Sequence, residues 1–210
     1  RLGDWVVMMV DPYAIDLAHE IAVQATLAGA NVSWIARDST FLEILYKYGS
    51  DEQIKWINPM LDLVIHKADV YIQLIAPSNT RILSGVDPSK QRMLAVAQND
   101  LLGDYLQRMS SNELRVNITQ APCPALAQEA DMSQADFENF VYAATFADQD
   151  DPIACWQKIE VEQERLVKWL EGKKEIKIQS PNAELTLSVE GRPFKNSSAT
   201  INLPSGEIYT

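Results

Sequence analysis

The end of the chain holds the residue best suited to chemistry. In the stretch N-L-P-S-G-E-I-Y-T, residues 202–210, the Pro-Ser-Gly triplet predicts a turn that presents Glu207 beside a rigid corner. A carboxylate held in this way can bind a hard or borderline cation, such as a divalent metal ion. The same pattern is also typical of a glutamate that is simply solvated. The residues of this stretch alone therefore leave both interpretations open.

The histidines and cysteines do not form a recognisable site. His19 and His66 both fall within predicted helices, without the H-E-x-x-H spacing of a helical zinc motif. We interpret both as structural or solvent-exposed, because a metal site needs several converging ligands. Cys123 and Cys155 lie far apart and form no C-x-x-C pair. We expect both cysteines to be reduced and structural.

A second candidate site lies where the predicted strands end. Ligands often bind outside the carboxyl ends of parallel strands, and Asp11, Asp38 and the loop 77–80 with Asn79 occupy such positions. A small ligand held near Asp11 and Asn79 would make the chain a stand-alone binding module. The alternative is that these polar residues cap helices and form turns. A pure interaction domain is a further possibility.

The elements that must position these residues alternate between strand and helix in the first part of the chain. A continuous apolar run at 5–10 predicts a strand that is covered on both faces, and shorter strands rich in apolar residues are predicted at 32–36, 70–75 and 114–118. Apolar residues at helical spacing predict helices between them, at 14–28, 41–48, 50–66 and 88–109. This order predicts an α/β fold in three layers, with a mainly parallel sheet and helices on both faces.

The later part changes character. Three helices are predicted at about 122–130, from Ser133, and from Pro152 to Gly172. After Gly172 the period becomes strictly alternating, at 175–179 and 184–189, which is typical of antiparallel strands with one wet face. We therefore predict an N-terminal α/β domain at 1–172. The residues 173–210 would form an incomplete antiparallel β segment that starts a second domain.

The composition excludes several classes of function. The 210 residues include 18 Lys and Arg but 29 Asp and Glu, which gives a formal net charge of −11. An acidic chain argues against nucleic-acid and anionic-membrane partners. No apolar run approaches the roughly 20 residues that span a bilayer, so we expect a cytoplasmic protein. The first residue is Arg1, which we do not expect to be the natural start.

The stretch that contains Glu207 resembles the N-x-P-x-G-E-[IV]-[FY]-T segment of the thermophilic aminopeptidases, the aminopeptidase T and S type of peptidase family M29. The resemblance extends over most of the chain, with family-like segments at Gly3-Asp4, 85–88, 151–153 with Trp156, and 181–192. The chain departs from the family pattern in the last of these segments. Ala183 and Glu184 stand where Thr-Asp is usual, which puts in doubt any role for those two positions.

The resemblance implies a metalloaminopeptidase that removes N-terminal residues from short peptides. In this family a site of two divalent ions, zinc or cobalt, lies in the C-terminal domain, and Glu207 matches the first ligand. The remaining ligands would follow Thr210. The chain would then be the N-terminal half, which helps to wall the active-site cavity and contributes to a homodimer. We expect this half alone to be inactive and to bind no metal.

Overall fold

Four parallel strands form the sheet of the first part of the chain. They are β1 (Trp5–Val10), β2 (Asn31–Ala36), β3 (Val70–Ile75) and β4 (Arg115–Gln120), in the spatial order β2-β1-β3-β4. Each neighbouring pair is parallel, and Val7 lies opposite Ser33 on one side and Tyr71 on the other. The computed structural model describes residues 1–210. The predicted α/β fold with a mainly parallel sheet is confirmed.

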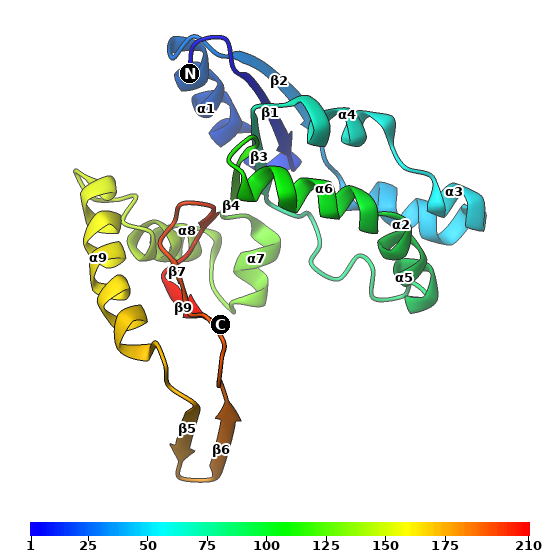
Figure 1. Ribbon diagram of the computed structural model, residues 1–210. Coiled ribbons are helices and arrows are strands. Elements are labelled where there is room, and N and C mark those ends of the chain that lie inside the picture. Colours follow the sequence, from blue (N-terminus) through cyan, green and yellow to red (C-terminus); the bar gives the residue numbers. More distant parts are fainter. The chain divides into compact units, whose positions relative to one another are not determined.

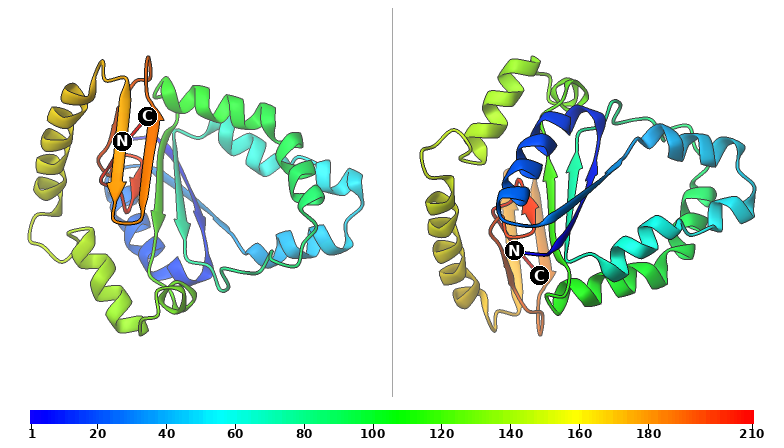
Figure 2. Two further views of the ribbon diagram at one scale, coloured as in Figure 1. Left: turned by 90° about the horizontal axis from the view of Figure 1, so that it is seen from below. Right: turned by 90° about the horizontal axis from the view of Figure 1, so that it is seen from above.

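Helices cover both faces of this sheet, as predicted. Successive residues of β1 point to opposite sides, so the strand contacts helices on both faces. Val6, Met8 and Val10 pack in one cluster with residues of α1 (Ile15–Leu27), which follows a short 3-10 turn, and of α7 (Pro124–Glu129). Val7 packs on the other side with residues of α4 (Pro59–Lys67) and α6 (Asn99–Ser110). Figure 2 shows α1 and α6 on opposite faces of the strands.

A third apolar cluster lies among α2 (Ser39–Tyr48), α3 (Asp51–Lys55) and α5 (Pro88–Ala97). Its centre is Ile54, whose side chain is fully buried. The single helix predicted at 50–66 was wrong. The chain leaves the helical conformation at Trp56 and starts again at Pro59, where Asn58 accepts a hydrogen bond from the Met60 N–H at 2.9 Å. Proline lacks the N–H that a continuous helix needs, so it begins a new helix.

The chain forms two compact units, Arg1–Phe140 and Val141–Thr210, and the division falls inside α8 (Gln134–Ala144). The second unit contains α9 (Pro152–Leu170) and the strands β5 (Glu175–Ser180), β6 (Ala183–Ser188), β7 (Lys195–Ser197), β8 (Asn202–Leu203) and β9 (Glu207–Tyr209). Gly172 adopts a φ of 72° just before the strands, a conformation that glycine tolerates best. That residue 172 ends a domain stays a prediction.

The β5 and β6 strands pair in antiparallel register and form the hairpin seen in Figure 1. Ile176 lies opposite Leu187, and Ile178 opposite Leu185, so the four aliphatic side chains share one face. Ile178 and Leu185 are each 50% exposed. The predicted antiparallel pairing is therefore confirmed, whereas the expectation of only one wet face was wrong, because the aliphatic face of this hairpin is also largely exposed. None of the helices in the chain is long and apolar enough to span a membrane.

Candidate functional site around Glu207

Glu207 begins the strand β9, and its backbone is fixed on both sides. β9 pairs antiparallel with β7, which places Glu207 opposite Ser197. Directly before it, the Gly206 N–H donates a hydrogen bond to the Ser197 carbonyl at 3.1 Å, and the hydroxyls of Ser197 and Ser205 lie 2.9 Å apart. The predicted Pro-Ser-Gly turn corresponds to the short connection at 204–206 between β8 and β9, with a bend at Pro204.

The far end of β9 is also held. Arg192 donates a hydrogen bond to the Thr210 carbonyl at 2.8 Å, and the Thr210 hydroxyl donates one to the Pro193 carbonyl at 2.8 Å. These bonds join the end of β9 to the loop before β7. Glu207 thus stands on a short strand that is tied down at both ends.

Helix α9 packs against the paired strands β7 and β9. The Trp156 ring lies against the turn: a Cβ atom on Gly206 would lie 3.7 Å from its Cζ3 atom. The Trp156 indole is itself fixed, because its N–H donates to the Thr145 carbonyl at 3.0 Å and its ring meets Phe146 edge-on at 5.6 Å. One turn further along α9, the Glu160 carbonyl accepts a hydrogen bond from the Asn196 amide of β7 at 2.9 Å.

The Glu207 side chain is exposed to solvent. A carboxylate on a fixed backbone provides one anionic oxygen ligand, and such a ligand suits a divalent ion. Nowhere in the chain do three His, Cys, Asp or Glu side chains converge in a way that could hold a metal ion. The donor set fits a metal site only as one contributor, and the other ligands would have to come from outside these 210 residues.

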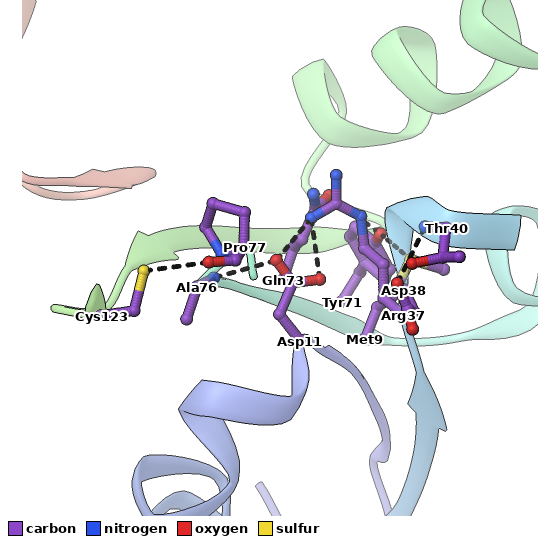
Figure 3. Close-up of polar contacts among 10 residues, drawn as sticks. All are labelled: Met9, Asp11, Arg37, Asp38, Thr40, Tyr71, Gln73, Ala76, Pro77 and Cys123. Atoms are coloured by element: carbon purple, nitrogen blue, oxygen red, sulfur yellow. Dashed lines mark hydrogen bonds and ion pairs between the residues drawn. The ribbon is translucent and has the colours of Figure 1, made fainter. Parts of the chain in front are cut away.

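The strand ends of the first unit are occupied by internal contacts, as Figure 3 shows for Asp11. The Asp11 carboxylate is 2% exposed, accepts hydrogen bonds from Arg37 at 3.1 Å and accepts another from the Ala76 N–H at 2.9 Å. It thereby joins the ends of β1, β2 and β3. Cys123 donates its S–H to the Pro77 carbonyl at 3.3 Å, which connects the end of β4 to the same edge.

The other strand-end residues cap and brace the backbone. The Asp38 carboxylate accepts a hydrogen bond from the Thr40 N–H at 2.8 Å and caps α2, a contact that lowers the pKa of Asp38. Asn79 accepts a hydrogen bond from the Arg81 N–H at 2.8 Å. The loop is then fixed to α7, because Glu129 accepts hydrogen bonds from Arg81 and Thr80 that lower its pKa to about 2. These contacts account for the strand-end residues as structural.

The remaining reactive side chains stand apart from Glu207 in the sequence and form no cluster with it. His19 is exposed on α1. His66 contacts the Asp62 carbonyl at 2.9 Å and the Asp104 carboxylate at 3.1 Å, so it connects α4 to α6, and these partners raise its pKa. Cys123 is buried, Cys155 is half-buried, and both are free thiols.

The protein thus has an α/β fold, and its second unit carries an exposed glutamate on a strand pair, β7 and β9, that packs against α9. The family described as thermophilic metalloprotease (M29) matches residues 1–210. The chain therefore belongs to the M29 family of thermophilic metalloproteases, and the resemblance stated from the sequence is confirmed.

Two relatives illustrate the extent of this similarity. The chain is 24% identical to Aminopeptidase 2 of Geobacillus stearothermophilus over 219 residues, which cover 94% of this chain and 53% of that protein. Its fold is similar to that of wild-type AmpT from Thermus thermophilus, with a TM-score of 0.75 and 18% identity over 99% of this chain and 56% of the other. The chain thus spans about half the length of the relatives it matches.

Sequence reasoning missed two features of these sites. It did not pair Asp11 with Arg37, although an arginine directly after a strand at the same sheet edge could have suggested the contact. It noted Trp156 only as an apolar helix position and as part of a family-like segment, without placing it against the turn before Glu207. No local pattern reports such a contact, since 50 residues separate Trp156 from Gly206 in the sequence.

Proposed function

We propose that this chain is part of a metal-dependent aminopeptidase, an enzyme that removes N-terminal residues from peptides. The observation that carries the proposal is the match to the thermophilic metalloprotease family over residues 1–210. The similarity to Aminopeptidase 2 supports cleavage at the amino terminus. Because the chain spans about half of that relative, the activity is proposed for the full-length protein.

Glu207 is proposed as one ligand of a site for two divalent ions, zinc or cobalt. Two such ions, when bound, polarise the scissile carbonyl and lower the pKa of a water molecule. The contribution of this chain is to fix the backbone at Glu207 and to keep its carboxylate accessible. Both requirements are met by the paired strand β9 and by the exposure of the side chain.

The 210 residues alone are expected to hydrolyse no peptide and to bind zinc weakly. A structural or catalytic zinc ion takes three or four protein ligands in fixed geometry, and Glu207 is one. The first unit has a different role in this proposal: it helps to wall the active-site cavity, restricts substrates to short peptides and contributes to a homodimer in the cytoplasm. Its strand-end polar groups are used internally, which fits a wall better than a reaction site.

The test uses the full-length protein after its metal has been removed with a chelator. Zinc or cobalt is added back, and hydrolysis of a short leucine peptide is compared with that of the same peptide after N-terminal acetylation. We expect metal-dependent release of free leucine from the first peptide only. Cleavage without added metal, or equal cleavage of the acetylated peptide, contradicts the proposal. A rate that stays constant as the peptide is lengthened contradicts the role of the first unit.

A further inference from the structure

The support beneath Glu207 suggests a function for a residue that is distant from it in sequence. We propose that Trp156 of α9 is the positioning residue for the Glu207 carboxylate, and this inference rests on the proposed function of Glu207 as a metal ligand. Trp156 does not touch the metal in this proposal. It acts through the backbone of Gly206, the residue directly before Glu207.

The Trp156 ring approaches the backbone of Gly206 closely. Gly206 has a φ of 109°, a conformation that side chains rarely tolerate, and the outer edge of the indole lies where a Cβ atom would make van der Waals contact, at 3.7 Å from Cζ3 and 3.8 Å from Cη2. The flat aromatic edge therefore limits how far the turn can move towards the helix. Because Glu207 is bonded to Gly206, the same limit applies to the start of β9.

The Trp156 ring is itself held by a hydrogen bond as well as by an aromatic contact. Its N–H donates a hydrogen bond to the carbonyl of Thr145, a residue that is only 5% exposed. Phe146 packs edge-on against the same ring, with an angle of 80° between the ring planes. The position and orientation of the indole ring are therefore fixed, and the ring can limit the position of the neighbouring Gly206.

Other hydrogen bonds fix β7 and Gly206 relative to α9. The Asn196 amide binds the Glu160 carbonyl of α9, which fixes β7 along the helix. The bond between Gly206 and Ser197 then fixes the turn relative to β7. With β7 fixed in this way, Trp156 sets the remaining coordinate, the distance of the turn from the helix. Residues that orient metal ligands from behind typically change metal affinity about 10-fold to 100-fold when they are replaced.

The experiment measures zinc affinity in the full-length protein, which is first stripped of metal and then titrated with zinc against a chromogenic chelator. Trp156→Leu removes both the aromatic edge and the N–H, whereas Trp156→Phe keeps a smaller ring. We expect zinc affinity to fall about 10-fold to 100-fold in Trp156→Leu and by less in Trp156→Phe. The matched control is Trp169→Leu on the same helix, because Trp169 is 64% exposed and contacts Lys173. The control should bind zinc as tightly as the parent.

Affinity is measured at a temperature at which circular dichroism shows every metal-free variant to be folded. A purely structural role for Trp156 would lower the unfolding temperature and leave the zinc affinity of the folded protein unchanged. If Trp156→Phe and Trp156→Leu both bind zinc as tightly as Trp169→Leu, the inference is refuted. Trp156→Phe keeps the test decisive should the leucine variant fail to fold.

A double-mutant cycle separates this inference from the proposed function. Glu207→Gln should itself weaken zinc binding, and in that background Trp156→Leu should have no further effect, because its action passes through Glu207. If Glu207→Gln binds zinc normally, the proposed ligand and this inference both fail. If Glu207→Gln weakens binding and the Trp156 variants do not, the inference alone fails. Additive losses from the two substitutions also overturn it.

Discussion

Replacing Asp11 by alanine tests whether this residue holds the strand ends together or belongs to a ligand site. The carboxylate is almost completely buried and has two internal partners, the Arg37 guanidinium and the Ala76 N–H. Asp11→Ala removes both contacts and leaves the Ala76 N–H without an acceptor at the centre of the sheet edge. Figure 3 shows that this carboxylate lies between its two partners.

The size of the effect follows from the burial of each partner. A buried N–H that loses its acceptor costs about 1–3 kcal/mol. The Arg37 side chain is 30% exposed and can regain water, so the loss of its ion pair adds about 1 kcal/mol or less. The free energy of unfolding should therefore fall by about 1–4 kcal/mol. Asp11→Asn retains an acceptor for Ala76 and should lose about 1 kcal/mol, mainly the charge of the pair.

The assay is equilibrium unfolding in urea, followed by tryptophan fluorescence and by circular dichroism. The matched control is Glu20→Ala, an exposed acidic residue on α1, which should change stability by no more than about 0.5 kcal/mol. The order of stability should be Glu20→Ala, then Asp11→Asn, then Asp11→Ala. If Asp11→Ala unfolds at the same urea concentration as Glu20→Ala, Asp11 does not stabilise the fold by linking the strand ends. A ligand role at the strand ends then becomes the better explanation.

Three further predictions follow from single contacts. Ser50→Ala should cost about 1 kcal/mol in urea unfolding, because Ser50 and Gln53 form a capping box at the start of α3; an unchanged midpoint would contradict this. Burial raises the pKa of Tyr71 to about 12 from 10.0, so wild-type stability should be complete below about pH 10 and then fall by roughly 2–3 kcal/mol towards pH 12. Tyr71→Phe should lack that loss, and parallel pH curves for the two proteins would refute it. Hydrogen bonds from Arg81 and Thr80 lower the pKa of Glu129 from 4.5 to about 2, so their stabilisation should be lost as the pH falls from about 4.5 towards 2. Glu129→Gln at neutral pH should likewise speed amide hydrogen exchange in residues 77–87, and equal exchange rates would count against the brace.

The fold was largely predictable because its signals are local. The continuous apolar run of β1 is what a strand covered on both faces requires, and β2, β3 and β4 appear within two residues of the apolar-rich segments that predict them. The errors lie where one chemical feature interrupts a helical period. Pro59 restarts the helix after Asn58, although the apolar spacing continues across the break. The helix expected at 88–109 is likewise divided, at Gln98.

The site was less predictable, because its residues meet through the tertiary structure. Asp11 and Arg37 come together only when β1 and β2 pair, and Trp156 approaches Gly206 only when the paired strands β7 and β9 pack against α9. Glu207 itself carried no physical signal beyond its turn. The family resemblance supplied its proposed role, and a solvated glutamate would look the same in the sequence.

The structure adds a physical distinction between these two interpretations of Glu207. A glutamate that only faces water gains nothing from a fixed backbone, since its side chain samples many conformers whatever the main chain does. A metal ligand gains directly, because ordering that is already present in the free protein lowers the cost of binding. Three contacts fix the main chain around Glu207. Ser197 binds the Gly206 N–H, the Trp156 ring lies close to Gly206, and Arg192 binds the Thr210 carbonyl. A backbone fixed in this way supports the proposal that Glu207 is a metal ligand, and a solvated carboxylate would not need it.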